Sequence, residues 1–146
     1  MRSVNYPEPA GTVETGQLRA GAHTDYGCMT ILRTEDAPGG LQVQTRGGEW
    51  VDVQAVPGSF VVNLGDMMAR WTNDRWPATL HRVAVPSPDR ALGSRRLTLV
   101  FFHDPRADAV VECIPSCADK AHPPQYEPIT ALAHVQAKAA QAQAAV

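Results

Sequence analysis

The stretch LQVQTRGGEWVDVQ, residues 41–54, decides the fold class of this chain. In its first four residues apolar and polar side chains alternate, which is typical of a strand with one face buried and the other in water. Gly47 and Gly48 then supply the positive φ angles that a tight hairpin turn requires. A second short segment, residues 50–54, follows directly. We therefore expect two antiparallel strands joined by this turn.

The same rhythm extends in both directions from the hairpin. From residue 2 to about residue 102, short segments rich in Val, Leu, Ile, Thr and aromatic residues are separated by Gly, Pro, Asn and Asp clusters, a pattern typical of all-β domains. The predicted strands are Arg2–Tyr6, Leu18–His23, Met29–Arg33, Leu41–Thr45, Trp50–Gln54, Phe60–Leu64, Thr79–Val85 and Arg96–Phe102, with a weaker one at Ala109–Ile114. Short strands with no helix between them favour a two-sheet jelly roll over a parallel α/β fold.

The C-terminal end has a different pattern. After Pro128, apolar residues fall at helical spacing at Ile129, Leu132, Val135 and Ala139, which predicts a helix. We expect one domain over residues 1–146, with a core at about 2–105 and an extension with this helix at about 106–146.

Composition narrows the function classes. The 146 residues include 13 basic and 15 acidic side chains, for a formal charge of -2, and neither sign forms a block or stripe. Nucleic acid and anionic membranes are therefore not expected as partners. No apolar run approaches the roughly 20 residues of a membrane-spanning helix. Three cysteines, Cys28, Cys113 and Cys117, do not form a disulfide framework, and we expect a cytoplasmic protein.

A His-x-Asp triplet ends the strand predicted for residues 18–23. Because strand side chains alternate in direction, His23 and Asp25 point to the same side and can offer two ligands to one metal ion. His81 is the candidate third ligand, on a segment in which apolar and non-apolar residues alternate. Two imidazoles and one carboxylate suit Fe(II) and leave three positions for a bidentate co-substrate and dioxygen. Zinc accepts the same ligands in a hydrolytic site, and the triplet also occurs by chance.

Arg96 and Thr98 form a second pair of polar residues that share one strand face, on a segment whose neighbours are apolar. An unpaired buried charge is costly, so a guanidinium that points into a barrel needs an anionic partner. A small dicarboxylate would provide one, because arginine's planar fork binds a carboxylate through two parallel hydrogen bonds and the Thr98 hydroxyl adds a third. The residues leave open that Arg96 pairs instead with a protein carboxylate such as Asp66, or lies at the surface.

Several segments, in this order, resemble the catalytic region of the isopenicillin N synthase-like family of Fe(II)- and 2-oxoglutarate-dependent oxygenases. They are HTDYGCMTIL (residues 23–32), GLQV (40–43), PGSFVVNLGD (57–66), HRV (81–83) and RLTLVFF (96–102). The resemblance covers most of the chain, and an ordered set of this kind is far more specific than a single triplet.

The resemblance implies a double-stranded β-helix that oxidises a small organic substrate with Fe(II), 2-oxoglutarate and dioxygen. It places the iron on His23, Asp25 and His81, and the distal carboxylate of 2-oxoglutarate on Arg96 and Thr98, where the family usually has serine. Tyr6 and, less directly, Asn5 resemble the family's strand that meets 2-oxoglutarate from the other side; a core aromatic and a turn residue are the alternatives. Members that do not use 2-oxoglutarate keep the same Arg-x-Ser pattern.

The chain is short for this family, whose members carry a mainly helical N-terminal region about as long again. With Met1 almost at the first predicted strand, we expect that region to be absent and a barrel face to be left uncovered, with self-association as one outcome. Two further functions therefore stay open. One is a catalytically silent metal-binding or interaction module of the same fold, and the other is a zinc hydrolase. The prime substrate and the reaction outcome are not indicated.

Overall fold

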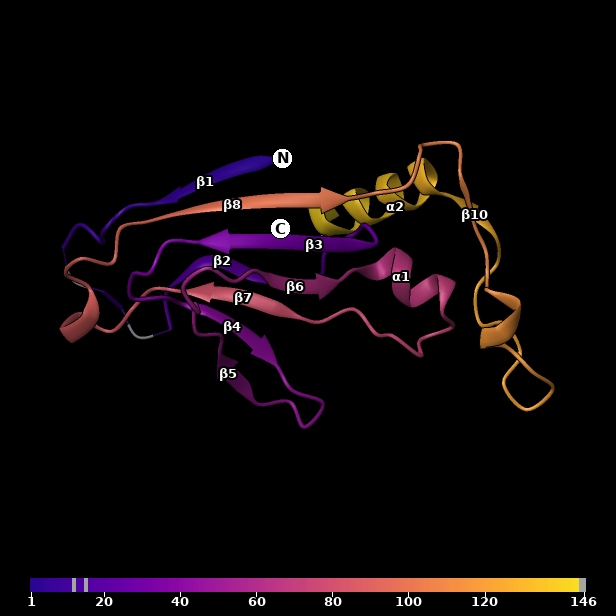
Figure 1. Ribbon diagram of the computed structural model, residues 1–146, viewed down its shortest axis with the longest axis horizontal. Coiled ribbons are helices and arrows are strands. Elements are labelled where there is room, and N and C mark those ends of the chain that lie inside the picture. The colour runs from indigo at the N-terminus through magenta and orange to yellow at the C-terminus, as the bar shows by residue number, and fades with distance from the viewer. Residues whose placement is uncertain (12, 15, 145–146) are drawn as a thin grey trace. The chain divides into compact units, whose positions relative to one another are not determined.

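The computed structural model describes residues 1–11, 13, 14 and 16–144, and most of its strands lie in two four-stranded sheets (Figure 1). The first sheet has the order β1-β8-β3-β6 and the second the order β2-β7-β4-β5. The strands are β1 (Arg2–Tyr6), β2 (Leu18–His23), β3 (Met29–Thr34), β4 (Leu41–Gln44), β5 (Trp50–Asp52), β6 (Val61–Leu64), β7 (His81–Ala84) and β8 (Arg96–His103). The ladders β1–β8, β2–β7, β4–β7 and β4–β5 are antiparallel.

Smaller elements follow or interrupt these strands. A short sheet pairs β9 (Val110–Val111) with β10 (Ile129–Thr130), and the helices are α1 (Asp66–Trp71) and α2 (Ala131–Ala144), with 3-10 turns at Pro88–Arg90 and Pro115–Cys117. In the part of the chain that the structure describes, neither helix has the length and apolar character needed to cross a bilayer.

All eight predicted core strands are present, with ends that differ by at most two residues. The expected hairpin is confirmed: β4 and β5 pair with Gln44 opposite Trp50, and Gly48 has a φ of 87°. The weaker strand predicted at 109–114 is only the two residues of β9. It pairs with β10, in which Ile129 lies opposite Val111. The predicted helix therefore begins at Ala131 rather than at Ile129.

The prediction that no helix separates the core strands was wrong. Helix α1 follows β6 and precedes β7. Its six residues, DMMARW, include Met, Ala and Arg, which are good helix formers, and Asp66 lies in the first turn, where a negative charge is favourable. Six residues are too few for an apolar periodicity to be recognised in the sequence.

Contacts divide the chain into two compact units. The first consists of Met1–Thr24, Ile31–Val62 and Thr79–Phe101. It contains the whole β2-β7-β4-β5 sheet, and its buried apolar residues include Leu41, Val83 and Val100.

The second unit consists of Asp25–Thr30, Asn63–Ala78 and Phe102–Val146. Its core is a cluster of Cys28, Met67, Val111 and Ala131, against which Met68, Trp71, Ile129 and Val135 pack. Helix α1 supplies the fully buried Met67 of this cluster, and α2 supplies Ala131. The second unit thus builds its own core around the segment that begins at Asp25.

Candidate functional site

The side chains of His23 and His81 lie next to each other on paired strands. His23 is the last residue of β2, His81 is the first of β7, and the two are direct partners in the antiparallel ladder. Their ring centroids are 4.3 Å apart, and the ring planes are inclined by 53°. The pairing of β2 with β7 is therefore what brings these two imidazoles together.

Both imidazoles are oriented by the backbone in the same way. Nδ1 of His23 lies 2.7 Å from the carbonyl oxygen of Gly21, and Nδ1 of His81 lies 3.0 Å from that of Thr79. A carbonyl oxygen can only accept, so in each ring Nδ1 carries a proton; in the neutral form of the ring, Nε2 then carries the lone pair. This is how metal-binding histidines are usually held, with one nitrogen donating to the protein and the other available to the metal.

Asp25 follows His23 with one residue between them, so its backbone lies close to the imidazole pair. Each of the three residues offers one ligand atom, and these atoms lie within 4.8 Å of one another. The side chain of Asp25 is also held from outside the triplet: Thr30 Oγ1 donates to its Oδ2 at 2.5 Å, and Asn63 Nδ2 donates to the same oxygen at 2.7 Å. Asp25 itself is 9% exposed.

This donor set fits a divalent transition metal. Two neutral imidazole nitrogens and one carboxylate oxygen match the two-histidine, one-carboxylate group that binds non-haem Fe(II) and leaves positions open. His23 is exposed while Asp25 and His81 are more enclosed, so the group is reachable from solvent at His23. Zinc is compatible with the same donors.

Arg96 lies in the interior of the first unit. Its side chain is 4% exposed, and its Nε is buried without a hydrogen-bond partner among the described residues. Its guanidinium carbon lies 5.3 Å from the ring centre of Tyr6. Burial lowers the pKa of Arg96 from its ordinary value, which the Tyr6 hydroxyl partly opposes. Asp66, the alternative partner considered from the sequence, forms an ion pair with Lys138 at 2.8 Å.

Thr98 and Tyr6 join Arg96 around a small void. Thr98 is 2% exposed, and its hydroxyl lies 3.2 Å from that of Thr34. The three residues share a cavity of about 20 Å³ with apolar side chains of both sheets, a volume that holds about one water molecule. Entry of a carboxylate group therefore requires the lining side chains to move. Asn5 is exposed and lies opposite Leu97 in the β1–β8 ladder, so the structure does not bring it to this cavity.

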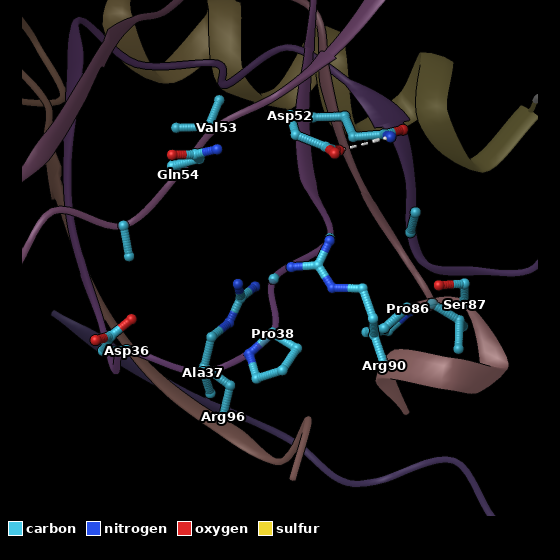
Figure 2. Close-up of a pocket in the computed structure, with 16 residues that line it drawn as sticks. Asp36, Ala37, Pro38, Asp52, Val53, Gln54, Pro86, Ser87, Arg90 and Arg96 are labelled. Carbon is cyan, nitrogen blue, oxygen red and sulfur yellow. Dashed lines mark hydrogen bonds between the residues drawn. The ribbon is translucent and has the colours of Figure 1, made fainter. Parts of the chain in front are cut away.

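A larger cavity of about 450 Å³ opens on the other side of Arg96 (Figure 2). Arg90 and Arg96 extend their guanidinium groups into it, and the carboxylates of Asp36 and Asp52 lie on its lining. Gln42 donates a hydrogen bond to Asp52 at 2.9 Å along the same lining. Arg96 thus faces a space large enough for a small organic molecule.

The sequence profile of the 2OG-Fe(II) oxygenase superfamily matches residues 1–105 of this chain. The chain belongs to this superfamily. Its two four-stranded sheets are accordingly those of a double-stranded β-helix. The resemblance inferred from the segments at residues 23–32, 57–66 and 96–102 is confirmed, as is the fold class.

Members of this oxygenase superfamily are similar to this protein over most of the length of the chain. The 2-oxoglutarate-Fe(II) type oxidoreductase hxnY of Emericella nidulans is 40% identical over 131 residues, which cover 89% of this chain and 36% of the relative. A 2OG-Fe(II) oxygenase family protein from Caulobacter crescentus has 36% identity and a TM-score of 0.84, covering 95% of this chain and 44% of that structure. A full-length Neurospora crassa protein in complex with alpha-KG has 36% identity and a TM-score of 0.77, covering 86% and 38%. The chain thus spans little more than a third of the length of the curated relative.

Sequence reasoning missed two residues of the candidate site, Thr30 and Asn63. Thr30 was assigned only to a strand and Asn63 only to another, because neither is a metal ligand by type. The available signal is their place within two segments of the resemblance, residues 23–32 and 57–66. Their hydrogen bonds to Asp25 became visible only with the fold.

Proposed function

We propose that this chain is the catalytic barrel of a non-haem Fe(II)- and 2-oxoglutarate-dependent dioxygenase that oxidises a small organic substrate. His23, Asp25 and His81 hold the iron, and Arg96 and Thr98, with Tyr6 beside them, bind the distal carboxylate of 2-oxoglutarate. The observation that carries this proposal is the approach of three ligand atoms to within 4.8 Å in a chain that belongs to the superfamily.

In this proposal some residues bind the iron and others bind and orient 2-oxoglutarate. When bound, Fe(II) with dioxygen supplies the oxidising power that couples decarboxylation of 2-oxoglutarate to succinate with oxidation of the substrate. His23 and His81 present Nε2 because backbone carbonyls fix Nδ1. Arg96 supports the dicarboxylate role because its buried Nε has no hydrogen-bond partner within the described part of the chain, and a carboxylate would satisfy it with a charge-assisted hydrogen bond. The Tyr6 ring stacks near the same guanidinium and shields it from water.

Anaerobic titration of the chain with Fe(II) and 2-oxoglutarate tests the proposal. A visible metal-to-ligand charge-transfer band should appear when both bind, and succinate should form once oxygen is admitted. His81→Ala should abolish the band. His122→Ala is the matched control, because His122 is exposed and its ring contacts Asp119 rather than the His23 pair.

The other outcomes identify the alternatives. Iron binding without the band, or a band without succinate on any substrate tried, indicates a silent metal-binding module of the same fold. Activity that requires zinc and no oxygen indicates a hydrolase. A chain that binds no metal at all contradicts the proposal in every form.

We also propose that the chain associates with itself and is found in the cytoplasm. Large apolar side chains are exposed on or beside two strands of the first sheet, among them Phe60 (60%), Val62 (54%), Leu99 (40%) and Phe101 (45%). Such exposure favours association with a second apolar surface, which sedimentation velocity over a range of concentrations would reveal. The three cysteines are unpaired, as in the reducing cytoplasm.

A further inference from the structure

The carboxylate of Asp25 accepts hydrogen bonds from two side chains that come from different strands. Thr30 lies on β3 and donates its hydroxyl to Oδ2 at 2.5 Å, while Asn63 lies on β6 and donates its amide to the same oxygen at 2.7 Å. All three residues belong to the second unit. Hydrogen bonds to an ionised acceptor are about twice as strong as neutral ones, so these two bonds are a substantial constraint on the side chain.

The two donors converge on one oxygen rather than sharing the carboxylate between them. A carboxylate oxygen has two lone-pair sites, and Thr30 and Asn63 occupy those of Oδ2. The burial of the donors keeps water from competing: Thr30 is 3% exposed and Asn63 is half-buried. An amide nitrogen cannot accept, so the bond from Asn63 runs in one direction only and fixes which oxygen is engaged.

We propose that Thr30 and Asn63 are positioning residues that make Asp25 bind the metal through Oδ1 alone. The inference rests on the proposed function and adds a reason for it. If each residue supplied one atom, the two-histidine, one-carboxylate set would leave three positions open for further ligands. A carboxylate that bound through both oxygens would take one of those three. Holding Oδ2 therefore preserves the position that the reaction needs.

Cobalt(II) is a suitable probe, because its visible absorption reports both affinity and coordination number and needs no turnover. The chain is titrated with Co(II), and the same titration is made on Thr30→Val, which keeps the shape but loses the hydroxyl, and on Asn63→Leu, which loses the amide. Thr72→Val is the matched control. Thr72 is also 3% exposed, but its hydroxyl donates to the Met68 carbonyl oxygen at 2.8 Å.

We expect each of the two variants to bind cobalt about 10- to 100-fold more weakly, the usual effect of losing a group that orients a ligand, and to show an altered cobalt spectrum. Thr30→Ser, which restores a hydroxyl, should recover most of the affinity and the original spectrum. Thr72→Val should bind as the unaltered chain does. A purely structural role would lower stability in all the valine variants without changing the spectrum.

The outcomes separate this inference from the proposed function. If the unaltered chain binds no cobalt, the proposed function fails and this inference with it. If the unaltered chain binds cobalt and folded Thr30→Val or folded Asn63→Leu binds it equally well with the same spectrum, only this inference is overturned. Circular dichroism shows which variants are folded, and Asn63→Leu carries the test if Thr30→Val is not.

Discussion

Arg96 carries a positive charge into a site that is 4% exposed, and its Nε has no hydrogen-bond partner among the described residues. Burial of a charge destabilises the folded chain unless it is fully paired, and it lowers the pKa of Arg96. The same feature is useful once an anion arrives, because the charge is already desolvated and in place. If Arg96 binds an anion as proposed, burial of this residue costs stability in the apo form and favours binding of the ligand.

Arg96→Met should therefore change stability and binding in opposite directions. The apo form should unfold at an equal or higher temperature, because the cost of burying a charge is removed and the volume is nearly kept. Affinity for 2-oxoglutarate should fall by about 1.5–3 kcal/mol, or about 10- to 150-fold. Calorimetric titration of the metal-loaded chain checks this, with Arg33→Met as control because Arg33 is exposed on β3. Equal losses in both variants would contradict the role of Arg96.

The burial of Cys28 predicts that the free energy of unfolding depends on pH, independently of metal binding. Burial, with a smaller contribution from Asp104, raises the pKa of its thiol from 9.0 to about 11. The unfolded chain thus loses this proton more readily than the folded chain. The contribution of the protonated Cys28 thiol to the free energy of unfolding is therefore fully present below pH 9 and is lost as the pH rises towards 11.

Urea unfolding at pH 8 to 11 should show this decline, and Cys28→Ala should show a smaller one, since tyrosines and lysines titrate in both chains. In the folded chain Cys113 and Cys117, which are half-buried, should react with a thiol reagent at pH 8 well before Cys28. Rapid modification of Cys28 would show that the cluster around it opens easily.

Among the elements, the junction between β6 and α1 sets the position of Asp25. A Cβ built on Gly65 would lie 2.3 Å from the carbonyl oxygen of Gly27 and 2.7 Å from that of Asp25. The amides of Gly65 and Asp66 donate to the carbonyl oxygens of Cys28 and Asp25. The absence of a side chain at Gly65 thus allows the start of α1 to lie directly against the segment that carries the proposed ligand Asp25.

Gly65→Ala should push these backbones apart. We expect a loss of about 1–3 kcal/mol in the free energy of unfolding, as for overpacking elsewhere, and weaker cobalt binding because Asp25 is displaced. Gly47→Ala is the control, since a Cβ there meets only Thr45 Oγ1, at 3.7 Å. Chemical denaturation and cobalt titration of both variants check the prediction, which fails if the two behave alike.

Comparison of the predicted and observed elements shows which features of the fold local sequence patterns predict. Alternating apolar residues and glycine turns are local signals, so the core strands and the β4–β5 hairpin could be predicted within two residues. The spacing of His23 and Asp25 is local as well. Helix α1 has no repeat to detect, and the β9–β10 pair joins residues 18 apart in sequence, Val111 and Ile129. The grip of Thr30 and Asn63 on Asp25 depends on two strands meeting, which no local pattern encodes.

In the whole molecule, the three proposed ligands are far apart in sequence, since His81 follows Asp25 by 56 residues. Only the β2–β7 ladder brings the imidazoles together, so the unfolded chain has no such site. Metal binding must then stabilise the fold by mass action, and a ligand that binds only the folded state at 100 times its Kd contributes about 2.7 kcal/mol. For a chain of this size that corresponds to roughly 5–10 °C in Tm.

Thermal unfolding followed by circular dichroism, with and without Co(II), should show this increase, and EDTA should reverse it. Asp25→Ala should lose the increment even if its apo form melts lower for want of the Thr30 and Asn63 hydrogen bonds, so the shift on adding metal is the quantity to compare. His122→Ala should keep the increment. An equal shift in the unaltered chain and in Asp25→Ala would mean that the ion binds elsewhere, because a carboxylate contributes too much of the charge in a site of two neutral imidazoles to be dispensable.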